Sequence, residues 1–128
     1  MTELVSIAST AAPAAVGPYV QAVAHRGVLY CSGSLPLNPA TGTIDATDIA
    51  AEARQCLTNL AAVCQAAGTD LDRALRMTVY TTKLRSFADI NTTYAEFFEA
   101  RCPARTTIEV AALPLGATVE IDAIVALP

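Results

Sequence analysis

The sequence predicts an α+β fold in which one sheet packs against two helices as two layers. Apolar residues recur at spacings of three and four in two segments, 49–64 and 87–98, which is typical of amphipathic helices. Short segments rich in β-branched and aromatic residues precede, separate and follow them, in the order strand, strand, helix, strand, helix, strand, strand. Helices and a sheet in this order make a compact two-layer fold.

One domain is expected, covering residues 1–128. A chain of 128 residues has the usual length of one domain and can bury one core. No repeat, low-complexity tract or linker suggests a boundary. Hydrophobic residues make up 53% of the chain and aromatics 5%, so the core must be mainly aliphatic. The apolar excess for so short a chain hints at apolar surface buried between subunits.

The N-terminal third is expected to be an arm followed by a hairpin and a loop. Residues 1–18 are rich in small side chains and read as an irregular arm with one short strand near 4–7. The apolar segments 19–24 and 28–32 flank a short connection that contains a glycine, which suggests a β-hairpin. Two glycines and two prolines in residues 33–42 predict a loop.

The first helix is expected to begin at Thr47 as the N-cap, with Asp48 favourable at the positive end of the helix dipole. Gly68 supplies a stop signal at the C-terminal end. Its apolar stripe consists of Ile49, Ala53, Cys56, Leu57, Leu60 and Cys64.

A strand over 74–82 and a second helix are expected next. Ser86 begins this helix, and Asp89 follows three residues later in an arrangement that resembles a capping box. Pro103 ends the segment. The apolar face of the helix consists of Phe87, Ile90, Tyr94, Phe97 and Phe98.

The last two strands are expected over 106–111 and 118–127, joined by a turn through Pro114 and Gly116. Apolar and polar residues alternate at the start of the final strand, but the run 123–127 is apolar throughout. Such a run indicates that both faces of the strand end are covered, which again favours contact between subunits.

Charge and composition exclude several classes of function. The net charge is −4 and the eight Lys and Arg residues are scattered, so the clustered cations that bind nucleic acid are absent from the sequence. No apolar run approaches the roughly 18 residues of a membrane span, and no leader pattern is seen, so a cytoplasmic protein without membrane contact is expected.

The cysteines are interpreted as reduced and structural. No Cys-x-x-Cys pair occurs and His25 is the single histidine, so the ligand spacing of a zinc site is missing. A redox role is the alternative reading. The four cysteines are Cys31, Cys56, Cys64 and Cys102.

Two charged residues stand out as candidates for chemistry. Alternation in the predicted strand places Arg105, Thr107 and Glu109 on one face, and Glu120 lies in an otherwise apolar strand. A guanidinium binds a carboxylate through two charge-assisted hydrogen bonds, and a carboxyl group can orient water and move protons. The alternatives are a structural ion pair for Arg105 and a solvated strand-face charge for Glu120.

A hairpin of the last two strands would separate these candidates. It would place Glu109 opposite Glu120, with Arg105 four residues further along, on the order of 13 Å away. Either the register differs or a neighbouring subunit completes the site. Read alone, Tyr19, Ser32 and Asn91 are a loop-edge aromatic, a turn hydroxyl and a helix-surface amide.

Four blocks of the sequence resemble the RidA/YjgF family in their order and spacing, over roughly residues 12–126. They are AAVGPYVQA (14–22), YCSGSLPLNPATG (30–42), NTTYAEFF (91–98), and PARTT (103–107) with the VAALP (110–114) and VEIDA (119–123) segments that follow it.

The resemblance implies a protomer like that of trimeric chorismate mutase, whose sheets form a central β-barrel with the helices outside. It implies a homotrimer with active sites in clefts between subunits. It also implies hydrolysis of reactive 2-imino acids and enamines, of the 2-aminoacrylate and 2-iminobutanoate type, to 2-oxo acids and ammonia. No metal or organic cofactor is used in that chemistry.

The resemblance also implies roles for individual residues. Arg105 would hold the substrate carboxylate, and Glu120 would position water and shuttle protons to the leaving ammonia. Gly33 would let backbone approach the ligand. The remaining residues of the pocket would be Tyr19, Ser32, Asn91 and Thr107.

Two positions depart from the family pattern. Many members carry glutamine where Ser34 stands, and many deaminating members carry cysteine where Thr107 stands. Both changes bear on the preferred substrate. A pathway-specific deaminase of aminomuconate or aminoacrylate compounds and a non-catalytic carboxylate-binding protein therefore stand as alternatives. RNA cleavage, attributed to some relatives, is disfavoured by the acidic charge.

Overall fold

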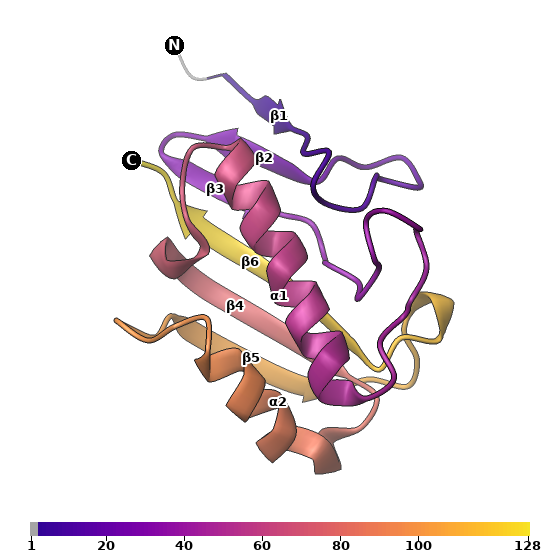
Figure 1. Ribbon diagram of the computed structural model, residues 1–128. Coiled ribbons are helices and arrows are strands. Elements are labelled where there is room, and N and C mark those ends of the chain that lie inside the picture. The colour runs from indigo at the N-terminus through magenta and orange to yellow at the C-terminus, as the bar shows by residue number, and fades with distance from the viewer. Residues whose placement is uncertain (1–2) are drawn as a thin grey trace.

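The computed structural model describes residues 3–128, which form one six-stranded mixed sheet with two helices (Figure 1). The order across the sheet is β1-β2-β3-β6-β4-β5. The elements in chain order are β1 (Val5–Ile7), β2 (Ala22–His25), β3 (Val28–Cys31), α1 (Ile49–Ala66), η1 (Leu71–Arg73), β4 (Ala74–Thr81), η2 (Leu84–Ser86), α2 (Phe87–Ala95), β5 (Ala104–Glu109), η3 (Pro114–Gly116) and β6 (Val119–Ala126). The predicted α+β class is confirmed.

The hairpin considered for the last two strands does not form. β4 lies between β5 and β6, parallel to β5 and antiparallel to β6. A parallel neighbour requires a crossover connection, and α2 provides it between β4 and β5. The turn at η3 does reverse the chain, with positive φ at Leu115 and Gly116, but it carries the chain past β4 rather than into a hairpin.

The β2–β3 hairpin forms as predicted. His25 pairs with Val28, and Arg26 and Gly27 make a two-residue turn with φ of 50° and 79°. Positive φ at both central residues is the requirement of the tight turn that matches strand twist, and glycine meets it without steric cost.

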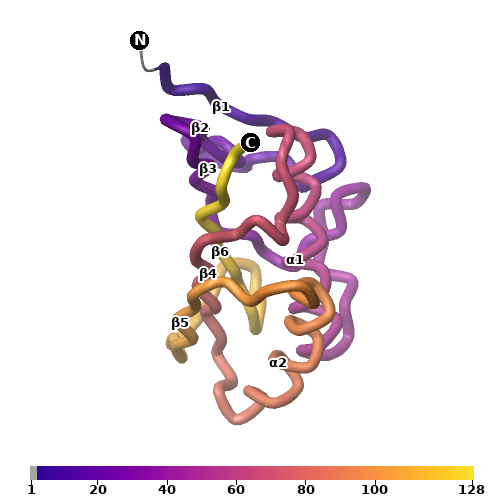
Figure 2. Tube along the Cα trace, turned by 90° about the vertical axis from the view of Figure 1, so that its left-hand side faces the viewer, coloured from indigo at the N-terminus to yellow at the C-terminus, as the bar shows by residue number. Residues whose placement is uncertain are grey.

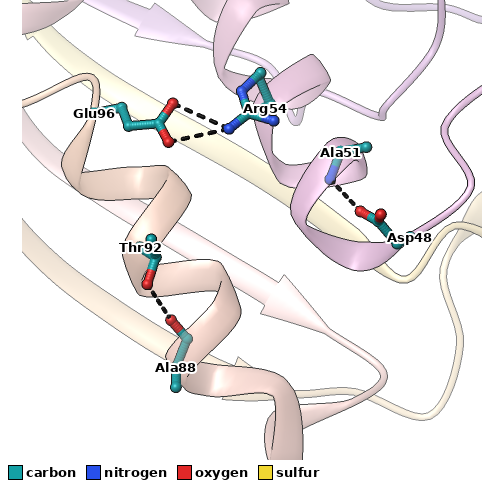
Figure 3. Close-up of polar contacts among 6 residues, drawn as sticks. All are labelled: Asp48, Ala51, Arg54, Ala88, Thr92 and Glu96. Atoms are coloured by element: carbon teal, nitrogen blue, oxygen red, sulfur yellow. Dashed lines mark hydrogen bonds and ion pairs between the residues drawn. The ribbon is translucent and has the colours of Figure 1, made fainter.

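Helix α1 begins one residue later than predicted. Asp48, not Thr47, is the N-cap, and its Oδ1 accepts a hydrogen bond of 2.8 Å from the Ala51 N–H (Figure 3). Gly68, with φ of 81°, follows the C-cap Ala67 and ends the helix as predicted.

Helix α2 has Ser86 at the N-cap position, but the predicted capping box does not form, since the Ser86 side chain makes no capping bond. The preceding turn η2 runs directly into the helix, and the Ser86 N–H donates to the Lys83 carbonyl at 2.9 Å. The two helices are linked by Arg54 and Glu96, whose atoms lie 3.1 Å apart at an exposed position (Figure 3). Exposed pairs of this kind stabilise a fold little.

Both helices cover the same face of the sheet, which we call the inner face (Figure 2). The sheet register places alternate residues of each strand there, and the core forms between them and α1. Cys56 and Cys64 of α1 are fully buried in this core, and all four cysteines are free. The largest inner-face side chains with no exposure are Leu29, Met77, Val79, Val119, Ile121 and Val125.

The opposite, outer face carries no helix in the part of the chain that the structure describes (Figure 2). Residues of β6 alternate strictly between buried inner and half-buried outer positions, including the apolar run near its end. Apolar side chains on the outer face remain accessible, with Tyr30 49% and Ile108 40% exposed. No helix among residues 3–128 combines the length and apolar character needed to cross a membrane.

Candidate functional site

Arg105 lies on the inner face of β5, in an aromatic slot beneath α2. Its register partner on β4 is the buried Met77, which confirms the predicted face. The guanidinium carbon Cζ lies 4.7 Å from the ring centroid of Tyr94 and 5.5 Å from that of Phe87. These rings are seven residues apart in the sequence, or two turns of α2, and therefore project from the same side of the helix.

The aromatic slot leaves the guanidinium without a carboxylate partner. Among residues 3–128 the one ion pair within 4.0 Å is that of Arg54 with Glu96, and the Arg105 side chain forms no hydrogen bond. The structural ion pair considered for Arg105 is therefore not seen. Aromatic faces attract a guanidinium without occupying its N–H edge, so the fork of donors stays available for a planar anion.

Buried polar atoms without partners occur on the side of α2 that faces Arg105, since Asn91 lies four residues after Phe87 and three before Tyr94, and on the same face of β5 as Arg105. They are Asn91 Oδ1 and Tyr94 Oη from α2, and Thr107 Oγ1 from the inner face of β5. Buried polar side chains are nearly always hydrogen-bonded, so several unpartnered ones beside an unpaired cation indicate a place where a polar ligand completes them. The predicted residues Asn91, Arg105 and Thr107 are thus brought together.

Glu120 lies on the outer face of β6, directly opposite Tyr80 of β4. Burial raises the pKa of the Glu120 carboxyl above its ordinary value, and the charge of Asp122 adds to that shift. A raised pKa makes the carboxyl a better proton carrier near neutral pH.

Gly33 is the backbone position against which the Glu120 carboxylate rests. A Cβ atom at Gly33 would overlap Glu120 Oε2, so any other residue here would force the Glu120 carboxylate to move from its observed position. The next residue holds the loop against β6, because Ser34 and Ile121 exchange two backbone hydrogen bonds of 2.7 and 3.1 Å. The Ser34 hydroxyl, at a departure from the family pattern, donates to the Cys56 carbonyl at 2.8 Å.

Tyr19, Ser32 and Gly33 line a cavity of about 50 Å³ between the N-terminal arm, the loop after β3 and helix α1. The arm is held by Gln21, whose amide bonds Ser9 and Pro13. The Ser32 hydroxyl donates to the Val20 carbonyl at 2.5 Å, and the Tyr19 hydroxyl accepts from the Val16 N–H at 3.3 Å.

The loop side of this cavity is held by the buried Asn59 of α1. Its Nδ2 donates to the carbonyls of Leu35 and Leu37 at 3.2 and 2.9 Å. The helix therefore sets the position of the loop that carries Ser32 and Gly33, and the bond to Leu37 is buried.

The predicted residues therefore form two groups, which one chain does not bring together. Arg105, Asn91 and Thr107 lie on the inner face, whereas Glu120 lies on the outer face beside Gly33. Two strand spacings separate β5 from β6, and the register adds three residues along the strands, about 10 Å in each direction. The predicted separation holds, although through a different strand arrangement.

Sequence reasoning assigned Phe87 and Tyr94 to the apolar face of α2 and missed their contact with Arg105. Their spacing of seven residues indicated that both rings lie on one side of the helix. The sequence did not show that this side packs against β5. Phe87 is 41% exposed, which is unusual for a core aromatic and fits a slot that opens to solvent.

The single histidine, His25, lies away from both groups of site residues. The His25 ring nitrogen Nδ1 lies 3.1 Å from the Glu3 carbonyl at the end of the β2–β3 hairpin. Within residues 3–128, no three His, Cys, Asp or Glu side chains are arranged to hold a metal ion.

Comparison with known proteins places the chain in a family. The family model described as "Endoribonuclease L-PSP" matches residues 9–127. The RutC family protein y4sK of Sinorhizobium fredii is 49% identical over 121 residues, covering 94% of this chain and 96% of that protein. The 2-iminobutanoate/2-iminopropanoate deaminase of Escherichia coli K12 is 45% identical over 122 residues, covering 93% and 94%.

A solved structure agrees with these sequence matches. The crystal structure of E. coli TdcF with bound serine superposes with a TM-score of 0.91 at 38% identity, covering 96% of this chain and 98% of that one. The quoted sequence blocks, the fold and these relatives agree, and the chain belongs to the RidA/YjgF family, to which the matching family model corresponds.

Proposed function

We propose that this protein hydrolyses 2-imino acids and their enamine tautomers to 2-oxo acids and ammonia. The observation that carries the proposal is the half-buried Arg105 guanidinium, which is held between two aromatic rings and has no anionic partner. A 2-imino acid presents a planar carboxylate next to its reactive carbon, and a guanidinium fork is complementary to it. The name of the E. coli deaminase at 45% identity supports the substrate class.

Substrate binding is assigned to the inner-face group. Arg105 holds the carboxylate through two charge-assisted hydrogen bonds, which fixes the imine carbon in one orientation. Asn91 and Thr107 offer unpartnered oxygens at the same contact, and they bond the polar edge of the bound molecule. The serine in the TdcF crystal structure supports this reading, because serine carries a carboxylate.

Water activation is assigned to Glu120. The imine carbon is electrophilic, so an attacking water needs orientation and a proton acceptor. A placed carboxyl group contributes typically about 10²–10⁴-fold to such proton transfers. Gly33 leaves space for the Glu120 carboxylate, and Tyr19 and Ser32 line the cavity next to it.

The two groups require a partner chain to act on one substrate. We propose a homotrimer in which the Glu120 group of one subunit meets the Arg105 group of the next. The accessible outer face, with Tyr30 and Ile108 exposed, supports burial against another copy. Light scattering that gives the mass of one chain would contradict this assembly.

The activity is tested by coupling the protein to a threonine dehydratase and following 2-oxobutanoate, with semicarbazide present to trap free imine. Wild-type protein should restore 2-oxobutanoate formation and Arg105→Ala should not. If neither protein changes the rate, the proposed activity toward 2-iminobutanoate is wrong, and a panel of imines from amino-acid oxidases then tests a pathway-specific deaminase.

Carboxylate binding without turnover is the second candidate. It is favoured by the separation of Arg105 from Glu120 in one chain, which leaves a complete anion site without a proton acceptor. Calorimetry that shows binding of 2-oxobutanoate, together with no rate enhancement on any imine, would support it over catalysis. The family description names an endoribonuclease, but the sequence lacks the clustered cations that RNA phosphate binding needs.

A further inference from the structure

The Tyr94 hydroxyl is a buried polar group that the fold leaves without a partner. The side chain is 7% exposed, and its Oη atom makes no hydrogen bond with residues 3–128. The Arg105 guanidinium packs over the Tyr94 ring, with its Cζ atom 4.7 Å from the ring centroid. The ring also packs on Phe98, with their centroids 4.7 Å apart.

Packing alone does not explain a tyrosine at this position. The aromatic contacts with Arg105 and Phe98 use the ring, and phenylalanine would keep both of them. Burial of a hydroxyl without a hydrogen bond costs free energy, so the tyrosine makes the ligand-free fold less stable than phenylalanine would. Residues that lower stability in this way concentrate where a ligand or a reaction needs them.

We propose that the Tyr94 hydroxyl donates a hydrogen bond to the substrate carboxylate, as a second donor beside Arg105. The inference rests on the proposed function and adds a binding residue to it. A carboxylate has about four acceptor positions, and a guanidinium fork occupies two, so a neighbouring hydroxyl has a free lone pair to bond.

The protonation state of Tyr94 suits a donor. Burial raises the pKa of the Tyr94 hydroxyl to about 12, although the positive charge of Arg105 opposes the shift. The hydroxyl therefore keeps its proton at neutral pH. The contact of the Arg105 guanidinium with the Tyr94 ring, 4.7 Å from Cζ to the ring centroid, keeps the hydroxyl-bearing ring next to the proposed carboxylate site.

The test is Tyr94→Phe, for which stability and affinity should change in opposite directions. The melting temperature of the ligand-free protein should rise by about 3 °C, because an unpartnered buried hydroxyl is removed. The Kd for 2-oxobutanoate, measured by calorimetry, should rise about ten-fold, as expected for a lost bond to a charged acceptor. A residue with a purely structural role would not change these two quantities with opposite signs.

Thr118→Val is the matched control. Thr118 Oγ1 is also buried and unpartnered, but its residue precedes β6, where its carbonyl accepts from the Thr82 N–H. This variant should raise the melting temperature and leave the Kd within two-fold of wild type, by the same removal of an unpartnered hydroxyl.

Arg105→Ala separates this inference from the proposed function. If Arg105→Ala loses 2-oxobutanoate binding but Tyr94→Phe keeps the wild-type Kd, the role of the hydroxyl is wrong while the carboxylate site stands. A fall in the melting temperature of Tyr94→Phe would also overturn it, because the hydroxyl would then have a structural partner. If Arg105→Ala binds like wild type, the proposed carboxylate site itself fails.

Discussion

Mixed assemblies of two inactive variants test whether the site lies between subunits. Arg105→Ala removes the carboxylate-binding group and Glu120→Ala removes the proton acceptor, and each variant alone should be inactive. The two residues lie on opposite faces of one sheet, about 10 Å apart both across and along the strands. One chain therefore cannot supply both residues to one small molecule, and we expect neighbouring subunits to supply one each.

The recovery of activity follows from the geometry of a ring. In a trimer with head-to-tail contacts, each site takes Arg105 from one subunit and Glu120 from the next. When the two variants assemble at random in equal amounts, about a quarter of the contacts join two intact residues, so activity should return to about a quarter of the wild-type level.

The assay is 2-oxobutanoate formation after both variants are co-expressed with different affinity tags and purified through both tags. Trimers purified through both tags always contain one intact site in three, so their expected activity is about one third. Proteins expressed apart and mixed without exchange serve as the inactive control. Mixed assemblies that stay as inactive as the separate variants would refute a site shared between subunits.

Three further predictions follow from single contacts. Gly33→Ala should lower kcat about 100-fold, because a Cβ atom would displace the Glu120 carboxylate and a shift of about 1 Å can cost that much, whereas the Kd of 2-oxobutanoate at Arg105 should change less than three-fold; a wild-type kcat in steady-state kinetics would contradict it. The pH profile of kcat/KM should fall on the acid side with a midpoint above 4.5, because burial raises the Glu120 pKa and the proton-accepting form is lost as the pH falls through that raised value. Asp122→Asn should lower this midpoint, because the charge of Asp122 also raises the Glu120 pKa, and an unchanged midpoint would contradict that contribution. Asp48→Ala should lower stability by about 1 kcal/mol in urea unfolding with activity unchanged, since the hydrogen bond to the Ala51 N–H is lost, whereas Thr47→Ala should have no such effect; equal losses for both would show that the capping bond does not stabilise α1.

Local patterns in the sequence were sufficient for most of the elements. Steric limits on φ act within a few residues, which is why Gly68 marked the end of α1 and the glycine at 27 marked the hairpin. Side-chain alternation is equally local, so it correctly placed Arg105, Thr107 and Glu109 on one face. The one-residue error at Thr47 and Asp48 is of the same local kind, because both residue types cap helices well.

The family resemblance predicted a set of site residues, but it did not predict how they are arranged in space. Arg105 and Glu120 were singled out, yet the sequence alone left open whether they meet in one chain. Asn91, Thr107 and Gly33 were expected in one pocket, and the structure divides them between the two faces of the sheet.

Only the tertiary structure decided which strands pair and what Arg105 contacts. β4 lies between β5 and β6, and α2 crosses over the sheet so that β5 returns parallel to β4. This pairing depends on how α2 packs on the sheet, which no local sequence pattern reveals. The resulting packing of α2 places Phe87 and Tyr94 over Arg105. Sequence periodicity tells which residues share a face, but packing between distant segments decides which faces meet.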